Sequence, residues 1–151
     1  MLRHLFALLI ASVLAAAAHA HHYSIGSLVI GHPWSRPTAS GMPTGVAYLS
    51  ITNNGLREDT LLAAHTPAAA RVEFHRTSFD AGMARMRPAE ALVVGPNSTI
   101  TAEPGGLHLM LVDLKSPLVV GSFVPLVLQF EAAGEITVQL KVEMAMDAAS
   151  H

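Results

Sequence analysis

The chain has 151 residues, of which 51% are hydrophobic and 13% charged, and its formal net charge is −2. This length suits one domain with a single core, and the composition excludes both a disordered chain and a nucleic-acid-binding protein, which would need a basic surface for phosphates. The sequence contains no cysteine. That excludes disulfides, thiolate zinc sites, lipid attachment through cysteine, thiol nucleophiles and the thiolate-ligated blue-copper centre.

The first twenty residues have the features of a secretory signal peptide. A short basic start is followed by an apolar run from Leu5 to Ala18, and Ala18-His19-Ala20 fits a small-x-small cleavage signal. The run is too short to span a bilayer as a permanent helix. We therefore expect cleavage near Ala20, export to the periplasm, and a mature chain (residues 21–151) without stable membrane insertion; a membrane-anchored N-terminus is the alternative.

The mature chain is patterned as short apolar runs separated by Gly, Pro and Asn turns. Runs that recur about every 8–12 residues are typical of an antiparallel β-sandwich or barrel. No segment of helical length shows a 3.6-residue apolar period. The sequence thus predicts one all-β domain. A Greek-key order of the strands is expected only because it is common among such domains. Strands are expected at residues 28–30, 45–52, 60–65, 71–77, 83–87, 98–102, 107–114, 123–130 and 135–142.

One expected strand carries two metal-binding side chains on the same face. In Leu107-His108-Leu109-Met110-Leu111 the leucines alternate with the histidine and the methionine. Because successive side chains of a strand point to opposite faces, the leucines should face the core and His108 and Met110 should share the other face. The Pro104-Gly105-Gly106 turn should place this pair near an end of the sandwich, where binding sites are usually built.

A second histidine and methionine are expected on a neighbouring hairpin. Val72 and Phe74 should face the core, which leaves His75 on the opposite face. If Ser78 pairs with Met83 across a four-residue loop, the register places His75 directly opposite Met86. The side chain of Met83 would then point to the opposite face of the strand from Met86, so Met83 is not expected to join the site. Arg85 and Arg87 flank Met86 on the other face, where solvation is the ordinary interpretation and a docking role the alternative.

Together, His75, Met86, His108 and Met110 offer two imidazoles and two thioethers to one ion. Thioethers are soft, neutral ligands that favour Cu(I) over zinc, calcium or magnesium. They cannot be lost to disulfides in an oxidising compartment, which agrees with the signal peptide and the absence of cysteine. The sequence therefore predicts a Cu(I) site. The alternative is that the methionines fill the core and the histidines lie on the surface, as they commonly do.

Three functional classes follow from this pattern. The first is a carrier that binds Cu(I) and has no catalytic turnover. The second is an enzyme, such as a copper oxidase or a histidine-dependent hydrolase, but the sequence shows no G-x-S-x-G motif and no convincing triad. The third is a module that binds only another protein and whose histidines are incidental.

Cleavage after Ala20 would create an N-terminus beginning His21-His22. A free amine beside an imidazole can chelate a divalent copper or nickel ion. The alternative is a frayed, solvated tail, which is the usual state of a terminus.

The candidate ligands carry a resemblance to the periplasmic copper chaperone family PCu(A)C. That family is marked by His, ten residues, Met, twenty-one residues, His, one residue and Met, and His75, Met86, His108 and Met110 match all three spacings. The resemblance covers almost the whole mature chain. Other matching segments are Trp34-Ser35-Arg36, residues 47–53, residues 72–75, Met86-Arg87-Pro88, residues 104–110, Leu114-Lys115 and Phe130-Glu131.

The resemblance implies a cupredoxin-like Greek-key sandwich, expected to be monomeric, that binds Cu(I) and delivers it to the CuA centre of cytochrome c oxidase subunit II. Sco-type proteins are implied as collaborators. Copper storage or scavenging without delivery is the alternative. Some family members bind further copper, including Cu(II), on a His- and Met-rich C-terminal extension. This chain has only a short version of it, so a second site is a further hypothesis. Its candidate ligands are His21, His22, Met144, Met146 and His151.

Overall fold

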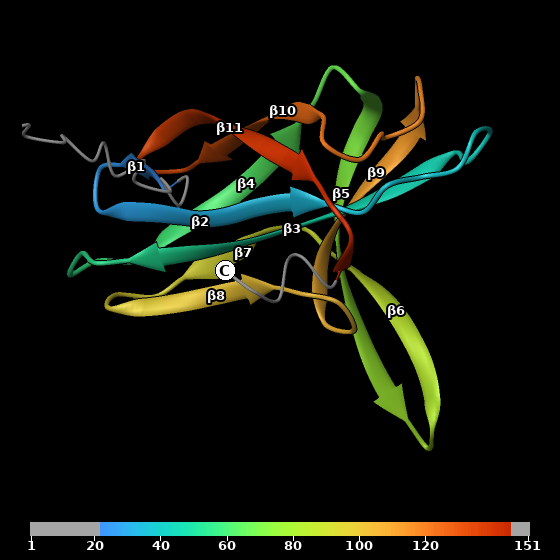
Figure 1. Cartoon of the computed structure of the whole chain (residues 1–151). Helices are drawn as coiled ribbons and strands as arrows, with labels where there is room; N and C mark the ends of the chain where they lie inside the picture. Colours follow the sequence, from blue (N-terminus) through green and yellow to red (C-terminus); the bar gives the residue numbers. More distant parts are fainter. Residues whose placement is uncertain (1–21, 146–151) are drawn as a thin grey trace, which may run out of the picture.

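The computed structural model describes residues 22–145, so the segment predicted to be a signal peptide (residues 1–20), His21, Met146 and His151 lie outside the described residues. The predicted all-β class is confirmed: eleven strands run through this range, and no helix lies between Tyr23 and Met144 (Figure 1). Within the same range nothing helical is long and apolar enough to cross a membrane. The strands are β1 Tyr23–Ile25, β2 Leu28–Ser35, β3 Thr44–Asn53, β4 Asp59–His65, β5 Ala69–Asp80, β6 Met83–Ala89, β7 Leu92–Val94, β8 Ser98–Ala102, β9 Leu107–Leu114, β10 Phe123–Phe130 and β11 Gly134–Val142.

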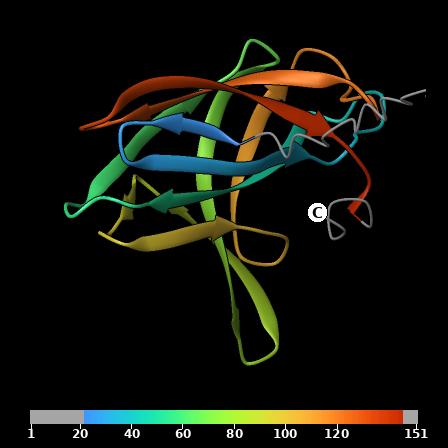
Figure 2. The same cartoon turned by 60° about the vertical axis from the view of Figure 1, so that its left-hand side comes forward.

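The strands form one continuous sheet in the order β6-β5-β9-β3-β2-β11-β10-β4-β7, with β1 added to β2 and β8 added to β3. In Figures 1 and 2, β10 and β11 lie above β2, β3 and β8, and in Figure 1 β4 crosses behind β2, so the sheet curls over into two layers. The pairing is antiparallel except between β2 and β11, which run parallel where Trp34 pairs with Lys141 and Ser35 with Val142. The predicted sandwich is therefore confirmed, with one parallel junction joining its layers.

The core follows the period-two alternation of the sequence. Every second residue of the central strands is fully buried while its neighbours face outward, as expected for strands with one face in the core. In β9 this face holds the leucines and leaves the histidine and the methionine outside it. The largest fully buried side chains are Leu28, Ile30, Ile51, Leu61, Val94, Leu109, Leu111, Leu126, Leu128, Val138, Leu140 and Val142.

All nine expected strands are present, but the pattern missed β1 and β7 and placed the end of β2 too early. Both missed strands have three residues, too few for a period to show. β2 continues through Pro33 because the register shifts between Gly31 and Trp34, where His32 adopts a φ of +42°. Such an irregularity takes the proline out of the regular ladder, and β2 resumes beyond it.

The register expected for the hairpin of β5 and β6 was wrong by two residues. Asp80 pairs with Met83, and only Ala81 and Gly82 form the turn. Their φ values of +48° and +79° are those of a two-residue hairpin turn whose twist matches that of the strands. Met86 is therefore opposite Thr77, not His75. Because a shift of two residues preserves the face of every side chain, Met86 still shares the face of His75.

We predict that Leu109→Ala lowers the free energy of unfolding by about 2–5 kcal/mol, because a fully buried leucine leaves a cavity between the layers. Urea unfolding followed by circular dichroism measures this loss. Leu56→Ala is the matched control, since Leu56 is 88% exposed and its truncation should change stability by less than about 0.5 kcal/mol. Equal effects of the two substitutions would contradict the assignment of Leu109 to the core.

Candidate metal centre

β9 presents His108 and Met110 on the face opposite its core leucines, as the alternation predicts. His108 is nevertheless only 5% exposed. Its Nδ1 lies 3.1 Å from the carbonyl oxygen of Gly106. A carbonyl can only accept, so Nδ1 carries the proton and donates it. The lone pair of His108 is thereby placed on Nε2, which is the nitrogen able to bind a metal.

β5 places His75 directly opposite His108 in the antiparallel ladder. The two ring centroids are 5.8 Å apart and the ring planes are inclined by 58°. With metal–nitrogen bonds of about 2.0 Å, and a ring centroid about 1 Å behind its nitrogen, two imidazoles on one ion have centroids at most about 6 Å apart. The observed separation therefore lies just within the reach of two imidazoles bound to one ion.

Glu73 fixes which nitrogen of His75 is free. His75 Nε2 lies 2.9 Å from Oε2 of Glu73, and a carboxylate only accepts, so Nε2 donates. His75 Nδ1 is buried and has no hydrogen-bond partner. A buried unpaired nitrogen costs free energy, and such an atom in a native protein needs an explanation. A metal ion bound at Nδ1 supplies one.

Glu73 is itself held by a chain of charged groups. Arg71 donates from Nε to Glu73 Oε1 at 2.7 Å and from Nη1 to Asp113 Oδ2 at 2.9 Å. The hydrogen bond from Arg71, and next the one from His75, hold the pKa of the Glu73 carboxyl below its usual value. Glu73 is thus ionised at neutral pH and acts as an acceptor towards His75. Glu73 and Arg71 were not among the residues expected at the site, although their period-two spacing with His75 places all three on one face.

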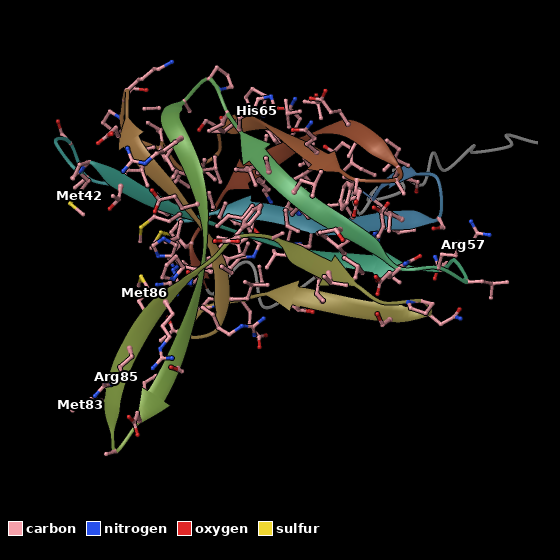
Figure 3. The ribbon with its side chains drawn as sticks, turned by 180° about the vertical axis from the view of Figure 1, so that it is seen from behind. Met42, Arg57, His65, Met83, Arg85 and Met86 are labelled. Carbon is pink, nitrogen blue, oxygen red and sulfur yellow. The ribbon has the colours of Figure 1, made fainter. Side chains whose placement is uncertain are left out.

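The two thioethers complete the same face. Met110 is half-buried and pairs with Glu73 on one side and with Val46 of β3 on the other. Met86 lies on β6, opposite Thr77 and therefore diagonal to His75, and it is 52% exposed. Diagonal neighbours on a sheet remain within reach of long side chains. In Figure 3, Met86 lies nearer the body of the sandwich than Met83 and Arg85, which lie towards the tip of the hairpin.

Three adjacent strands, β6, β5 and β9, therefore bring His75, Met86, His108 and Met110 onto one surface, whereas Met83 lies on the other face as parity predicted. Within residues 22–145 no group of three or more His, Cys, Asp or Glu residues is placed to hold a metal ion. On this face the further candidate donors beside the two imidazoles are the thioethers of Met86 and Met110. Such a donor set favours a soft ion.

The second-site candidates are only partly described. His22 lies beside β2: a β-carbon placed on Gly31 would be 3.5 Å from its Nδ1. Ala145 lines a cavity together with Gly31 and His32, so the first and last described residues flank the same strand. Met144 is exposed. His21, Met146 and His151 lie outside the described residues, so the second-site hypothesis stays a prediction.

Comparisons with known proteins identify the family of the chain. Residues 28–142 match the family described as putative lipoprotein LpqE-like. A curated relative, the putative lipoprotein Lxx21020 of Leifsonia xyli subsp. xyli, is 27% identical over 131 residues, which are 86% of this chain and 78% of the relative.

The fold is similar to that of several solved structures. The copper-bound PCuAC domain from PmoF2 is 32% identical with a TM-score of 0.71 over 82% of this chain and 97% of that domain. The Cu(I) form of DR1885 from Deinococcus radiodurans is 26% identical with a TM-score of 0.63 over 87% of each chain. The resemblance found in the sequence is therefore confirmed, and the chain belongs to the LpqE-like family and has the cupredoxin-like sandwich of a PCuAC domain.

Proposed function

We propose that this protein is a periplasmic copper chaperone that binds one Cu(I) ion through His75, Met86, His108 and Met110. The observation that carries the proposal is the buried, unpaired Nδ1 of His75, directly across the ladder from His108 on a face that also bears two thioethers. The copper-bound PCuAC domain and the Cu(I) form of DR1885 have the same fold and support copper as the cargo.

The two histidines bind through different nitrogens in this proposal. His75 uses Nδ1 because Glu73 occupies its Nε2, and His108 uses Nε2 because Gly106 occupies its Nδ1. Each imidazole is thus oriented before the ion arrives, with one nitrogen engaged in a hydrogen bond and the other facing the proposed site. Hydrogen bonds of this kind to a ligating histidine are the usual way in which a protein orients the ring and raises its basicity.

The exposure of the ligands favours delivery over storage. His108 is covered, the side chain of His75 is 14% exposed, and Met86 is the most open of the four. A neutral thioether at the open side can be replaced by an incoming thiolate while the histidines still hold the ion, so that Cu(I) is handed over by stepwise ligand exchange. No bond of a substrate is broken, so the protein acts as a carrier without catalytic turnover.

The proposed acceptor is the CuA centre of cytochrome c oxidase subunit II, with Sco-type proteins as collaborators. An exported, monomeric carrier whose ligands include no cysteine fits an oxidising compartment, where thiols would be lost to disulfides. A Cu(II) ion held at the termini stays a separate proposal.

We predict that the protein binds one Cu(I) per monomer and that the Met86→Ala, Met110→Ala double variant binds it at least about 100-fold more weakly, since losing one outer-shell partner already costs about 10–100-fold. Competition with a chromophoric Cu(I) chelator measures the affinity, and X-ray absorption should count two sulfur and two nitrogen ligands. Met83→Ala is the control, because Met83 lies on the other face. A double variant with wild-type affinity would refute the ligand set.

We also predict that Glu73→Leu weakens Cu(I) binding by about tenfold, the lower end of outer-shell effects, because Glu73 is partly exposed. Glu73→Gln should lose less, since its amide oxygen can still accept the proton of His75 Nε2. The ¹⁵N chemical shifts of the His75 ring in the metal-free protein report the tautomer directly. A Leu variant that keeps both the affinity and the shifts of the wild type would remove Glu73 from the site.

A carrier should consume no oxygen after copper loading, beyond what free copper consumes at the same concentration. An oxygen electrode with the Cu-loaded protein tests this expectation. Substrate-free oxygen consumption well above that background would favour the copper-oxidase alternative. A protein that stays metal-free after anaerobic addition of Cu(I) would instead favour a module that binds only other proteins.

A further inference from the structure

The outer part of the β5–β6 hairpin, residues 76–88, has no covering on either face. We call it the distal hairpin. Every residue in it except Thr77 is exposed. Figures 1 and 2 show the hairpin projecting away from the two layers of the sandwich. A two-stranded ribbon is at best marginally stable alone in water, so a ribbon held out in this way is a surface suited to being covered by something else.

One face of the distal hairpin is apolar and continuous with the proposed copper site. Phe79 and Met86 have the same parity as His75, which places all three side chains on this face. Phe79 is 70% exposed. Exposed aromatic and methionine side chains gathered on one surface are typical of interaction sites. Whatever covers Phe79 must therefore lie against Met86, the most open ligand.

The other face of the distal hairpin is cationic. Arg76 and Arg87 are directly opposite each other in the ladder, and Arg85 lies beside them, 3.7 Å from Asp80. Neither Arg76 nor Arg87 forms an ion pair with a described carboxylate. Three of the nine Lys and Arg residues of a chain with net charge −2 are thus concentrated on one short ribbon. Like charges directly opposite across strands are destabilising, and an acidic partner would relieve that cost.

The chemistry of the two faces favours one kind of binding partner for the distal hairpin over the others. A second copy of the chain would bring further arginines to the same place, which like-charge repulsion opposes. A flat anionic membrane can contact only one face of the ribbon at a time, whereas the apolar and the cationic side chains lie on opposite faces. A protein cleft can enclose both faces, with an apolar wall against Phe79 and carboxylates against the arginines.

We propose that the distal hairpin is the docking element for the protein that exchanges copper with this chain, and that this partner has an acidic cleft beside its own copper ligands. The inference rests on the proposed function, because it identifies the covering protein as the copper partner. Docking would place the incoming ligands next to Met86, where exchange begins, while the histidines remain covered.

The test uses three single variants and the metal-free, soluble CuA domain of cytochrome c oxidase subunit II as the probe. Arg87→Glu removes the cationic pair and creates an attractive Glu–Arg pair across the ladder, so the hairpin itself should not be weakened. Phe79→Ser removes the apolar contact. Arg57→Glu is the matched control: it makes the same charge change in the β3–β4 loop, away from the hairpin (Figure 3).

The dissociation constant is measured by NMR titration of the metal-free chain at low salt, so that it does not depend on copper binding. Wild type and Arg57→Glu should bind alike, and Arg87→Glu and Phe79→Ser should bind at least about tenfold more weakly, as for central interface residues. Competition with the chromophoric chelator should give one Cu(I) affinity for all four proteins. Failure of the wild type to bind Cu(I) would reject the proposed function and leave the docking measurement interpretable on its own.

The docking inference is overturned if Arg87→Glu binds the CuA domain as tightly as wild type, or if wild type does not bind it at all. It is also overturned if the same substitutions abolish binding to phosphatidylglycerol vesicles instead, which would assign the hairpin to a membrane surface. A wild-type dimer that both substitutions dissociate in sedimentation experiments would likewise assign the surface to a second copy of the chain.

Discussion

The site depends on the direct pairing of His75 with His108 across the β5–β9 ladder. Each ring is oriented by a hydrogen bond that it donates, to Glu73 in the case of His75 and to the Gly106 carbonyl in the case of His108. The remaining nitrogens are therefore committed before any ion binds. Preorganisation of this kind lowers the entropy lost on binding. It also explains why the fold tolerates an unpaired, buried Nδ1 at His75.

The pairing in turn depends on ordinary core packing. Phe74 is opposite Leu109 in the same ladder, and both are buried between the layers. Because strand side chains alternate, burying these two residues forces their neighbours His75 and His108 onto the outer face. A slip of one residue would turn the imidazoles towards the core between the layers and the core side chains outward, at a large cost in hydrophobic free energy. The apolar core therefore specifies the register of the polar face.

The alternation of strand side chains also determines how much of the site could be predicted from the sequence alone. The face to which a strand side chain points depends only on its position among its sequence neighbours. The alternation therefore predicted correctly the faces of His75, Met86 and His108. The register of the hairpin is set by its turn, and Ala81-Gly82 lacks the Asn or Asp that usually marks a two-residue turn, so the expected loop was too long. The adjacency of β5 and β9 is a nonlocal pairing that no periodicity contains. For the same reason the Glu73 contact, which matters only once the rings face each other, could not be recognised.

The proposed ligand set would allow the protein both to hold an ion and to release it. The two imidazoles lie on β5 and β9, inside the sheet and fixed by neighbours on both sides, whereas Met86 lies on β6, an edge strand that continues into the distal hairpin. An edge strand supported on one side gives way at lower free energy than a central strand. Loss of Met86 would leave Met110 and both imidazoles in place, so the ion need not be released into solvent during transfer. In the proposed exchange, the element that gives way is also the element whose exposed faces suit a partner, so contact with the partner would promote release of the ion.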